Sequence, residues 1–403
     1  MSIVFDPNTP ELKEAPYVYM NRIRDQASIL PSLGKGVHVV TSYAHVKGLM
    51  TDSDLSVRYI PKHIDLLATT DIPCIKSLGE LAIVFTDPPE HQRLRKLHLN
   101  VFNSKVIDSF LPVIKGDVKN VLSKLAINKS IDVVDSLADQ IPRQVLSHLL
   151  GIPKKYQDEI IETLLNVRGL LEPALLTPRK LKRLEAEFAC CKNLFHEIIA
   201  QYREEPDRNL ISLLIEGDKK GDGLSDEELA ITCTLTFIAG HETTKGLISS
   251  AAKLFAEAPE QWDLLKKNRS LIRPAIDEIA RFEPPLHFTT RLATHDFDLD
   301  SYQVYESDLI LLCLASANRD PSIFENPDVF NILRENHKNV SFGLGMHNCI
   351  GKHLAHTELT TLFESMLDLN VRFYKDGEYA EVWSDQGATT RSLEKLCLCI
   401  GNP

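Results

Sequence analysis

The sequence lacks several features that would assign a protein to a class at once. No apolar run reaches the roughly 18 residues of a membrane span, and residues 1–28 show no apolar core of a signal peptide. None of the eight cysteines belongs to a Cys-x-x-Cys pair, which argues against a zinc or disulfide scaffold. No Gly-x-Gly-x-x-Gly follows a predicted strand, so no flavin or dinucleotide domain is expected. We therefore expect a cytoplasmic protein without a membrane anchor.

Positive charge is also scarce. Lys and Arg number 45 against 56 Asp and Glu, which gives a net charge of −11. General nucleic-acid binders are usually basic, so this balance argues against nucleic acid as a partner. Hydrophobic residues make up 43% and charged residues 25% of the chain, as in folded globular proteins. Because there is no internal repeat and no convincing linker, we interpret residues 1–403 as a single domain.

The order of helical and strand patterns predicts a mainly α fold with a minor β region. Strand patterns fall mainly in residues 30–60, 290–315 and 370–400. Helical patterns dominate residues 88–282 and return at 350–367.

The longest helix is predicted to begin after Ser225. Ser225 and Glu228 form a capping box, in which each side chain binds the other residue's backbone N–H. Leu224 and Leu229 are spaced for a hydrophobic staple across this cap, and Pro259 marks the end. Such a helix would be about 45–50 Å long and would cross the whole molecule.

One cysteine stands in a loop of closely spaced glycines. Residues 342–351 read Phe-Gly-Leu-Gly-Met-His-Asn-Cys-Ile-Gly, and a helical pattern follows directly. Free backbone N–H groups and the N-terminal end of a helix both favour a thiolate, so we expect Cys349 to lose its proton readily. A single thiolate is what haem iron needs as an axial ligand. The alternative is a glycine-rich turn around a buried structural cysteine.

The pattern Phe-Gly-x-Gly-x-His-x-Cys-x-Gly resembles the haem-binding loop of the cytochrome P450 monooxygenases. The resemblance implies the cytochrome P450 fold, with haem b (iron protoporphyrin IX) held between a long central helix and the cysteine loop. Cys349 would bind the iron. Further haem contacts in this loop would come from Phe342, Gly343, Gly345, His347 and Gly351.

The middle of the long helix reads Ala239-Gly-His-Glu-Thr-Thr244. Glycine inside a helix costs about 1 kcal/mol relative to alanine, and close approach of a flat ligand is one reason for it. Threonine can bond the carbonyl one turn earlier and bend the helix, which would open a groove for dioxygen. By resemblance to the oxygen-activation segment of the family, Glu242 and Thr243 would be catalytic, and Ala239 and Gly240 would lie against the haem. The alternative is a kinked core helix with a solvated glutamate.

Two further groups of residues are assigned by the same resemblance. Glu278, Arg281 and Arg334 would form a buried charge network that braces the haem-binding core, which is a structural role. The haem propionates would be held by His91, Arg95, Arg291 and His347. The chain departs from the family pattern at Asn339, where a histidine is common, and at Asp300-Ser301 and Glu306-Ser307, which replace the usual glycines of a hairpin.

The implied activity is that of a haem-thiolate monooxygenase, which inserts one oxygen atom of O2 into a C–H bond of a hydrophobic small molecule. A separate ferredoxin or flavodoxin-type partner would supply the electrons, and the chain would act as a monomer. Two alternatives stay open. A peroxide-driven peroxygenase on the same fold commonly lacks the acid–alcohol pair, and a non-enzymatic haem sensor would be expected to bring an output domain.

The electron donor and the substrate would bind at two different places. The electron donor is expected near Arg93, Lys96 and Lys352. The substrate pocket would be lined by Leu235, Ala239, Leu286, Phe288 and parts of the loop from Ile60 to Val84.

Overall fold

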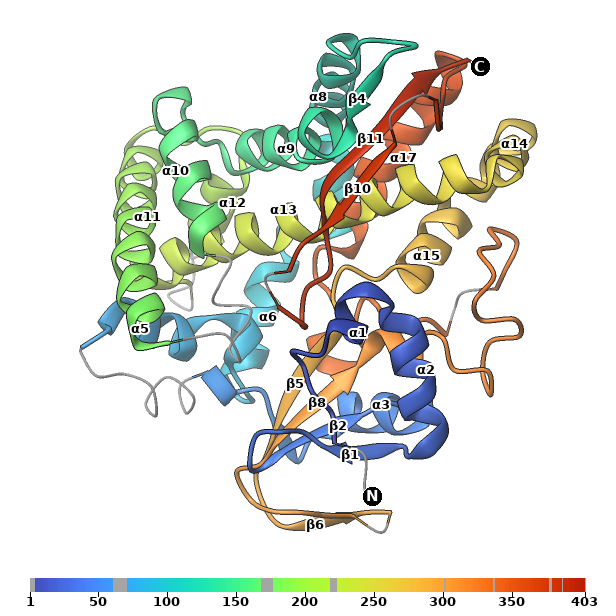
Figure 1. Cartoon of the computed structure of the whole chain (residues 1–403). Helices are drawn as coiled ribbons and strands as arrows, with labels where there is room; N and C mark the ends of the chain where they lie inside the picture. Colours follow the sequence, from blue (N-terminus) through green and yellow to red (C-terminus); the bar gives the residue numbers. More distant parts are fainter. Residues whose placement is uncertain are drawn as a thin grey trace.

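Helices dominate the molecule, as predicted. The structure is a computed structural model that describes residues 4–60, 71–167, 177–217, 223–300, 302–335, 338–376, 379–385 and 387–402. Helix α13 (Asp226–Glu257) crosses the molecule and contacts helices of the N-terminal half as well as strands near the C-terminus (Figure 1). The other helices are α1 (Pro10–Glu14), α2 (Pro16–Gln26), α3 (Tyr43–Thr51), α5 (Pro73–Leu81), α6 (Glu90–Leu99), α7 (Ser104–Ser109), α8 (Leu111–Ser123), α9 (Gln140–Leu150), α10 (Lys154–Val167), α11 (Pro178–Glu204), α12 (Leu210–Glu216), α14 (Pro259–Lys267), α15 (Ile272–Phe282), α16 (Leu314–Ala317) and α17 (Lys352–Asp368).

Helix α13 begins and ends where the local sequence predicts. The Ser225 hydroxyl accepts from the Glu228 N–H at 3.2 Å, and the Ser225 N–H donates to the Glu228 carboxylate at 2.7 Å. Leu224 and Leu229 are both buried beside this cap. The helix stops at Glu257, and α14 starts at Pro259, because a proline ring cannot continue the hydrogen-bond ladder. Its 32 residues span about 48 Å.

The strands form a five-stranded sheet, a four-stranded sheet and a hairpin. The first sheet has the order β1-β2-β8-β5-β3 and the second joins β10, β11 and β4, with β9 also paired to β11. Strands β2 and β8 are parallel, with Val37 opposite Leu309 and Val40 opposite Leu312. The strands are β1 (Ile29–Pro31), β2 (Val37–Val40), β3 (Leu55–Ser56), β4 (Ser130–Asp132), β5 (Phe288–Ala293), β6 (Phe297–Leu299), β7 (Tyr302–Val304), β8 (Leu309–Cys313), β9 (Arg372–Tyr374), β10 (Ala380–Trp383) and β11 (Leu393–Gly401).

Several elements differ from the sequence-based expectation. Helices α1 and α2 occupy the N-terminal segment, where the sequence shows no clear period. Strand β4 lies inside the region 88–282 predicted as helical, and its Ile131 pairs with Leu398 of β11. A π-helical turn at Val134–Ala138 follows it. A three-residue strand is too short to show a period, so only its distant partner reveals it.

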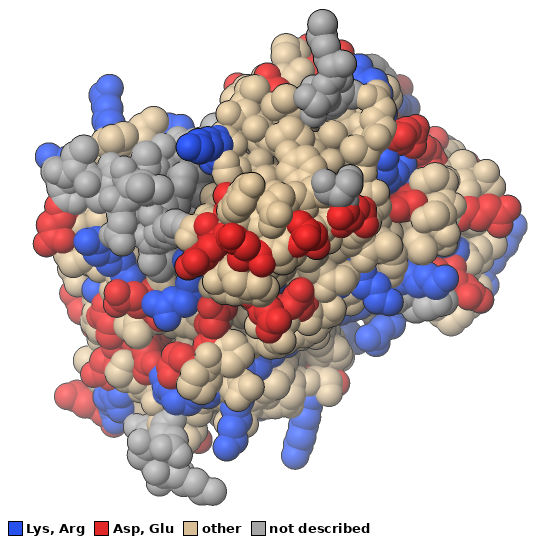
Figure 2. Space-filling model, turned by 90° about the horizontal axis from the view of Figure 1, so that it is seen from below, with Lys and Arg blue, Asp and Glu red and all other residues tan. Residues whose placement is uncertain are grey.

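The surface carries both signs of charge. On the face shown in Figure 2, several Asp and Glu side chains gather near the middle, with Lys and Arg side chains between and around them. This distribution agrees with the net charge of −11. Among the helices that the structure describes, none combines the length and apolarity that a bilayer span requires.

Candidate active site

The cysteine loop is shaped by two glycines with a left-handed backbone. Gly343 and Gly345 have φ angles of 69° and 68°, which other residues rarely adopt. The space is also tight, because a Cβ at Gly343 would lie 3.3 Å from the His347 carbonyl oxygen. The Cys349 N–H then donates to the Phe342 carbonyl at 2.7 Å and closes the loop just before α17. The two glycines and this hydrogen bond therefore determine where the Cys349 sulfur lies.

The prediction that Cys349 loses its proton readily is wrong for the protein alone. The backbone N–H groups of Gly351 and Lys352, and the charge of Arg95, do act to lower the pKa of the thiol. Loss of hydration among the surrounding protein atoms is the larger effect, however, and raises the pKa above its ordinary value. A coordinated metal ion deprotonates a thiol outright, so a raised pKa is compatible with a metal-ligand role.

Four cationic or hydrogen-bond-donating side chains converge beside this loop. His91 and Arg95 come from α6, Arg291 from β5 and His347 from the loop itself. The rings of His91 and His347 lie 4.1 Å apart between centroids. Burial, followed by the charges of His91, Arg291 and Arg95, lowers the pKa of His347 to about 3. Arg291 is buried and donates to the carbonyl of Met50 at 3.3 Å.

This cluster suits an anionic ligand. Both ring nitrogens of His91 are buried without a hydrogen-bond partner. The nearby Asp87 carboxylate already accepts from the Ser56 hydroxyl and the Val57 N–H. Buried donors of this kind are costly unless a partner satisfies them. The two propionates of a haem fit the charge and the donor set.

The second group of candidate residues lies on a strip of α13. Most of this helix is buried, yet Ala239 is exposed and Gly240 and Thr243 are half-buried. The Thr243 hydroxyl donates to the Ala239 carbonyl at 2.6 Å, one turn earlier. In the cysteine loop, a Cβ at Gly351 would meet no atom within 4 Å. The open space at Gly351 and the unpartnered donors of His91 therefore fit a cofactor with anionic groups beside the cysteine loop.

Two residues of the central segment face elsewhere. A Cβ at Gly240 would lie 3.1 Å from Cδ2 of Leu146 in α9, so helix packing explains this glycine without a ligand. Glu242 is buried and points to the C-terminal sheet, where its carboxylate accepts from the Ser392 hydroxyl at 3.0 Å. The acid and Thr243 therefore lie on different faces of α13.

Not every residue that was expected to line the substrate pocket lies where that role requires. Leu235 and Leu286 are half-buried, as a lining residue would be. Phe288 is not a lining residue, because it packs into the N-terminal core with its ring 5.5 Å from that of Phe5. Of the segment from Ile60 to Val84, which was expected to be a loop, residues 61–70 lie outside the described residues, and residues 73–81 form helix α5.

The expected electron-donor surface also changes. Arg93 forms ion pairs with Glu90 and with the buried carboxylate of Glu228, so it supports the start of α13 and is not a free surface cation. Lys96 is exposed. Lys352 lies 3.5 Å from the Asp277 carboxylate and over the ring of Phe342.

Comparison with known proteins identifies the family. A family model described as "Cytochrome P450" matches residues 30–269 and 261–373. The chain belongs to the cytochrome P450 family. It is thus an enzyme of the P450 monooxygenase class, and a haem-thiolate cofactor is implied.

Several relatives of this P450 are known. It is 30% identical over 383 residues to the "Biotin biosynthesis cytochrome P450" of Bacillus subtilis, which covers 92% of this chain and 94% of that one. It is 29% identical over 378 residues to the "Steroid C26-monooxygenase" of Rhodococcus jostii, covering 90% and 78%. A crystal structure of P450BioI in complex with hexadec-9Z-enoic acid ligated acyl carrier protein has a TM-score of 0.87 at 28% identity, covering 96% of this chain and 99% of that one.

The buried charge network of this P450 joins three elements. Arg281 donates two hydrogen bonds to Glu278, at 2.7 and 2.8 Å, and both side chains are fully buried. Arg334 donates to the same carboxylate at 3.2 Å. Arg281 also donates to the carbonyls of Asn318 and Pro327, each at 2.9 Å. Every oxygen of Glu278 is thus paired, and α15 is tied to the segment before the cysteine loop.

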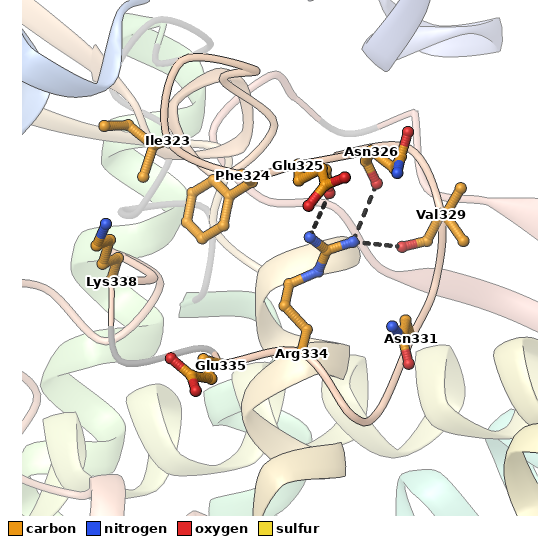
Figure 3. Close-up of a pocket in the computed structure, with 9 residues that line it drawn as sticks. All are labelled: Ile323, Phe324, Glu325, Asn326, Val329, Asn331, Arg334, Glu335 and Lys338. Carbon is orange, nitrogen blue, oxygen red and sulfur yellow. Dashed lines mark hydrogen bonds between the residues drawn. The ribbon is translucent and has the colours of Figure 1, made fainter.

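Arg334 also forms one wall of a surface cavity of about 470 Å³ (Figure 3). Its guanidinium donates hydrogen bonds to the carbonyls of Glu325, Asn326 and Val329. These bonds hold the loop that contains the three residues around the arginine side chain. The cavity is lined by Ile323, Phe324, Glu325, Asn326, Val329, Asn331, Arg334, Glu335 and Lys338.

Residues that depart from the family pattern adopt the backbone conformation or form the hydrogen bonds that their positions require. Asp300 and Ser307 adopt φ angles of 54° and 78°, the left-handed conformation for which glycine is usual. Ser301 lies outside the described residues. Asn339 accepts from the Ser341 N–H at 3.2 Å and donates to the Asp277 carbonyl at 3.5 Å.

Several residues of the site were missed by reasoning from the sequence. Asn348 receives hydrogen bonds from Arg95, and Ser392 and Lys245 both contact Glu242. Lys245 is three residues after Glu242 on the helix, which could have indicated the contact. Nothing in the sequence places Ser392 beside the helix, because 150 residues separate the pair.

A buried acid stands on α17, the helix that follows the cysteine. Glu358 is fully buried, and its Oε2 atom has no hydrogen-bond partner. Burial, and to a lesser degree the charge of Asp117, raises its pKa to about 8. Asp117 is itself paired with His148 at 2.8 Å. Glu358 is therefore protonated at neutral pH.

Replacement of Glu358 by glutamine is expected to stabilise the fold by about 3 kcal/mol at pH 7. The folded pKa lies above the unfolded value of 4.5, so the wild-type protein loses stability as pH rises from about 4.5 to 8. Glutamine removes this loss, and the two proteins should differ little at pH 4.5. Urea unfolding across this pH range measures the effect, with Glu364→Gln on the same helix as control. Parallel pH profiles for wild type and Glu358→Gln would contradict the assignment.

Proposed function

We propose that this P450 binds haem b through Cys349 and hydroxylates a hydrophobic small molecule with O2. The observation that carries the proposal is the convergence of Cys349 with four donor side chains, one of which has two buried ring nitrogens without a partner. The propionates would be held by His91, Arg95, Arg291 and His347. Phe342, Gly343 and Gly345 would shape the loop that holds the sulfur, and Gly351 would leave room for the porphyrin beside it.

The haem, when bound, supplies the activation of dioxygen and the oxidation of the substrate. The chain supplies the ligand, the pocket and the protons. Thr243 would donate a hydrogen bond to dioxygen bound near Ala239, after turning from its present acceptor, the Ala239 carbonyl. Glu242 would deliver protons from the interior behind the helix. Leu235, Leu286 and Ala239 would exclude water from the substrate side.

Partners and substrate are proposed from chemistry and from relatives. A ferredoxin or flavodoxin-type donor would reach the thiolate side, where Lys96 is exposed. The half-buried apolar residues favour a hydrophobic substrate, and the relatives suggest which compounds to screen. One is named for a steroid oxidation, and another was crystallised with a fatty acyl chain on an acyl carrier protein.

The first test is the reduced carbon-monoxide difference spectrum of the purified protein, which reports thiolate ligation. A screen of fatty acids, acyl carrier protein conjugates and steroids then follows the change from low to high spin. Substrate-dependent NADH use with a ferredoxin and its reductase is expected to yield hydroxylated product. Product formation from hydrogen peroxide alone would favour the peroxygenase, and a thiolate spectrum without turnover of any ligand would favour the sensor.

Replacement of Thr243 by alanine is expected to lower product formation per NADH by about 100-fold, because positioned proton donors contribute at least that much. The carbon-monoxide spectrum and the substrate-induced spin change should be unaffected. Thr243→Ser, which keeps the hydroxyl, should restore product. Hydrogen peroxide released per NADH is the second measurement.

A matched control is Thr234→Ala on the same helix. The Thr234 hydroxyl donates to the Ala230 carbonyl at 2.8 Å, the same kind of bond, but it is buried away from the open strip. An equal loss in both variants would mean that the hydroxyl matters for the helix and not for proton delivery.

A further inference from the structure

Asn348, the residue directly before Cys349, holds the side chain of Arg95 at two points. Nη1 of Arg95 donates to the Asn348 carbonyl oxygen at 2.7 Å, and Nη2 donates to Oδ1 of the Asn348 side chain. A guanidinium is planar, so two bonds to acceptors of one residue fix its plane as well as its position. Arg95 belongs to α6 and Asn348 to the cysteine loop. The two segments are therefore joined at this guanidinium.

The contact leaves Arg95 able to bind an anion. A guanidinium has five N–H donors, and the two bonds to Asn348 use only part of them. His91 lies four residues earlier on the same face of α6, and both of its ring nitrogens are buried without a partner. Its ring lies 4.1 Å from that of His347 in the cysteine loop. Arg95 thus keeps donors available beside the other donors of the proposed propionate site.

Arg95 and the sulfur also act on each other through their charges. Burial lowers the pKa of Arg95, and the charge of Cys349 acts against this change. Burial raises the pKa of the Cys349 thiol, and the charge of Arg95 is among the effects that oppose it. Asn348 therefore holds a positive charge within electrostatic reach of the sulfur.

We propose that Asn348 is a positioning residue, which sets the Arg95 guanidinium in advance for a haem propionate and keeps its charge beside the sulfur. This role rests on the function proposed above, because it requires the haem at Cys349. An arginine side chain has many rotamers, so holding one of them in advance lowers the entropy that is lost when the propionate binds. A hydrophobic side chain at position 348 would leave only the backbone carbonyl as an anchor.

The test is Asn348→Ala, which removes Oδ1 and leaves the backbone carbonyl in place. Losing one hydrogen bond changes the population of the held guanidinium by about fivefold, so haem transfer to excess apomyoglobin should become about fivefold faster. The reduction potential should become more negative by about 40 mV, the one-electron equivalent of fivefold, because a fixed cation favours the reduced site. The carbon-monoxide band of the thiolate should remain. Met346→Ala, which changes an exposed side chain of the same loop, is the control and should behave as wild type.

A double-mutant cycle measures whether Asn348 acts through Arg95. In an Arg95→Met background, which keeps the length of the side chain but removes its donors and its charge, Asn348→Ala should change neither the transfer rate nor the potential. Arg95→Lys is a second background that keeps the charge for the propionate. An ammonium lacks the planar fork that fits both acceptors of Asn348, so the effect of Asn348→Ala should be smaller there than in the wild type.

The outcomes separate this role from the proposed function. A wild-type transfer rate and potential in Asn348→Ala would overturn the positioning role and leave the monooxygenase function standing. An equal effect of Asn348→Ala with and without the Arg95 guanidinium would also overturn it, since Asn348 would then act on the loop itself. A wild-type protein without a thiolate spectrum and without product would overturn the function instead.

Discussion

Replacement of Cys349 by alanine is expected to abolish the thiolate band of the carbon-monoxide spectrum and all oxygenation of substrate. In the proposed site the Cys349 sulfur is the ligand of the iron, and alanine offers none. The fold should persist, because the loop is held by the Cys349 N–H, which an alanine keeps, and by the two left-handed glycines. Absorbance spectra, iron content and circular dichroism of the purified variant measure these three properties.

Two other cysteine variants serve as controls for this prediction. Cys349→Ser keeps the size but replaces the soft sulfur with a hard oxygen, so any bound haem should show a changed spectrum. Cys190→Ala removes an exposed thiol on α11, distant in the chain from the loop, and should behave as wild type. A Cys349→Ala protein that purified red with unaltered optical bands would refute the ligand assignment and the function with it.

Replacement of Arg281 by alanine is expected to destabilise the fold by about 3–5 kcal/mol. Removing the arginine leaves the fully buried carboxylate of Glu278 with Arg334 as its remaining cation, and it frees the carbonyls of Asn318 and Pro327. The cost arises mainly from the buried charge that stays behind. Urea unfolding measures the loss, and weaker haem retention should accompany it.

The control variants test the geometry of this network. Arg281→Lys keeps the charge but cannot donate two parallel bonds to one carboxylate, so it should lose nearly as much stability. Arg269→Ala breaks an ion pair with Asp368 at 2.7 Å, but both side chains are more than half exposed, and the loss should stay below about 1 kcal/mol. Equal losses at Arg281 and Arg269 would show that burial of the network contributes nothing.

The sequence predicted those parts of the molecule that short-range patterns determine. The capping box of α13 and the glycines around Cys349 are local features, and the structure has the two cap hydrogen bonds and the left-handed glycines. The buried pair Glu278–Arg281 was assigned by the family resemblance, because its spacing alone usually marks a weak surface ion pair. The helix-rich class was also predicted correctly, because long amphipathic patterns are the strongest sequence signal.

The parts of the fold and of the site that the sequence did not predict depend on contacts between residues far apart in the chain. The place of Phe288 after the Pro284-Pro285 turn suggested a pocket residue, with plain core as the alternative. Its ring packs in a core with Phe5 and with residues of α1 and α2, helices that were not predicted. Glycine 240 faces α9 because of helix packing, which no pattern within α13 reveals. The pKa of Cys349 was predicted in the wrong direction, because local N–H groups can be read from sequence and the density of surrounding atoms cannot.

The parallel pairing of β2 with β8 has a consequence for synthesis in the cell. The edge of β2 that pairs with β8 stays uncovered until residues 309–312 have been synthesised, long after residues 37–40. At 5–20 residues per second, the delay on the ribosome is roughly 15–50 s. During this time an edge that reads Val-His-Val-Val is open to other nascent chains. Yield should therefore depend on chaperone supply and on translation speed between these two strands.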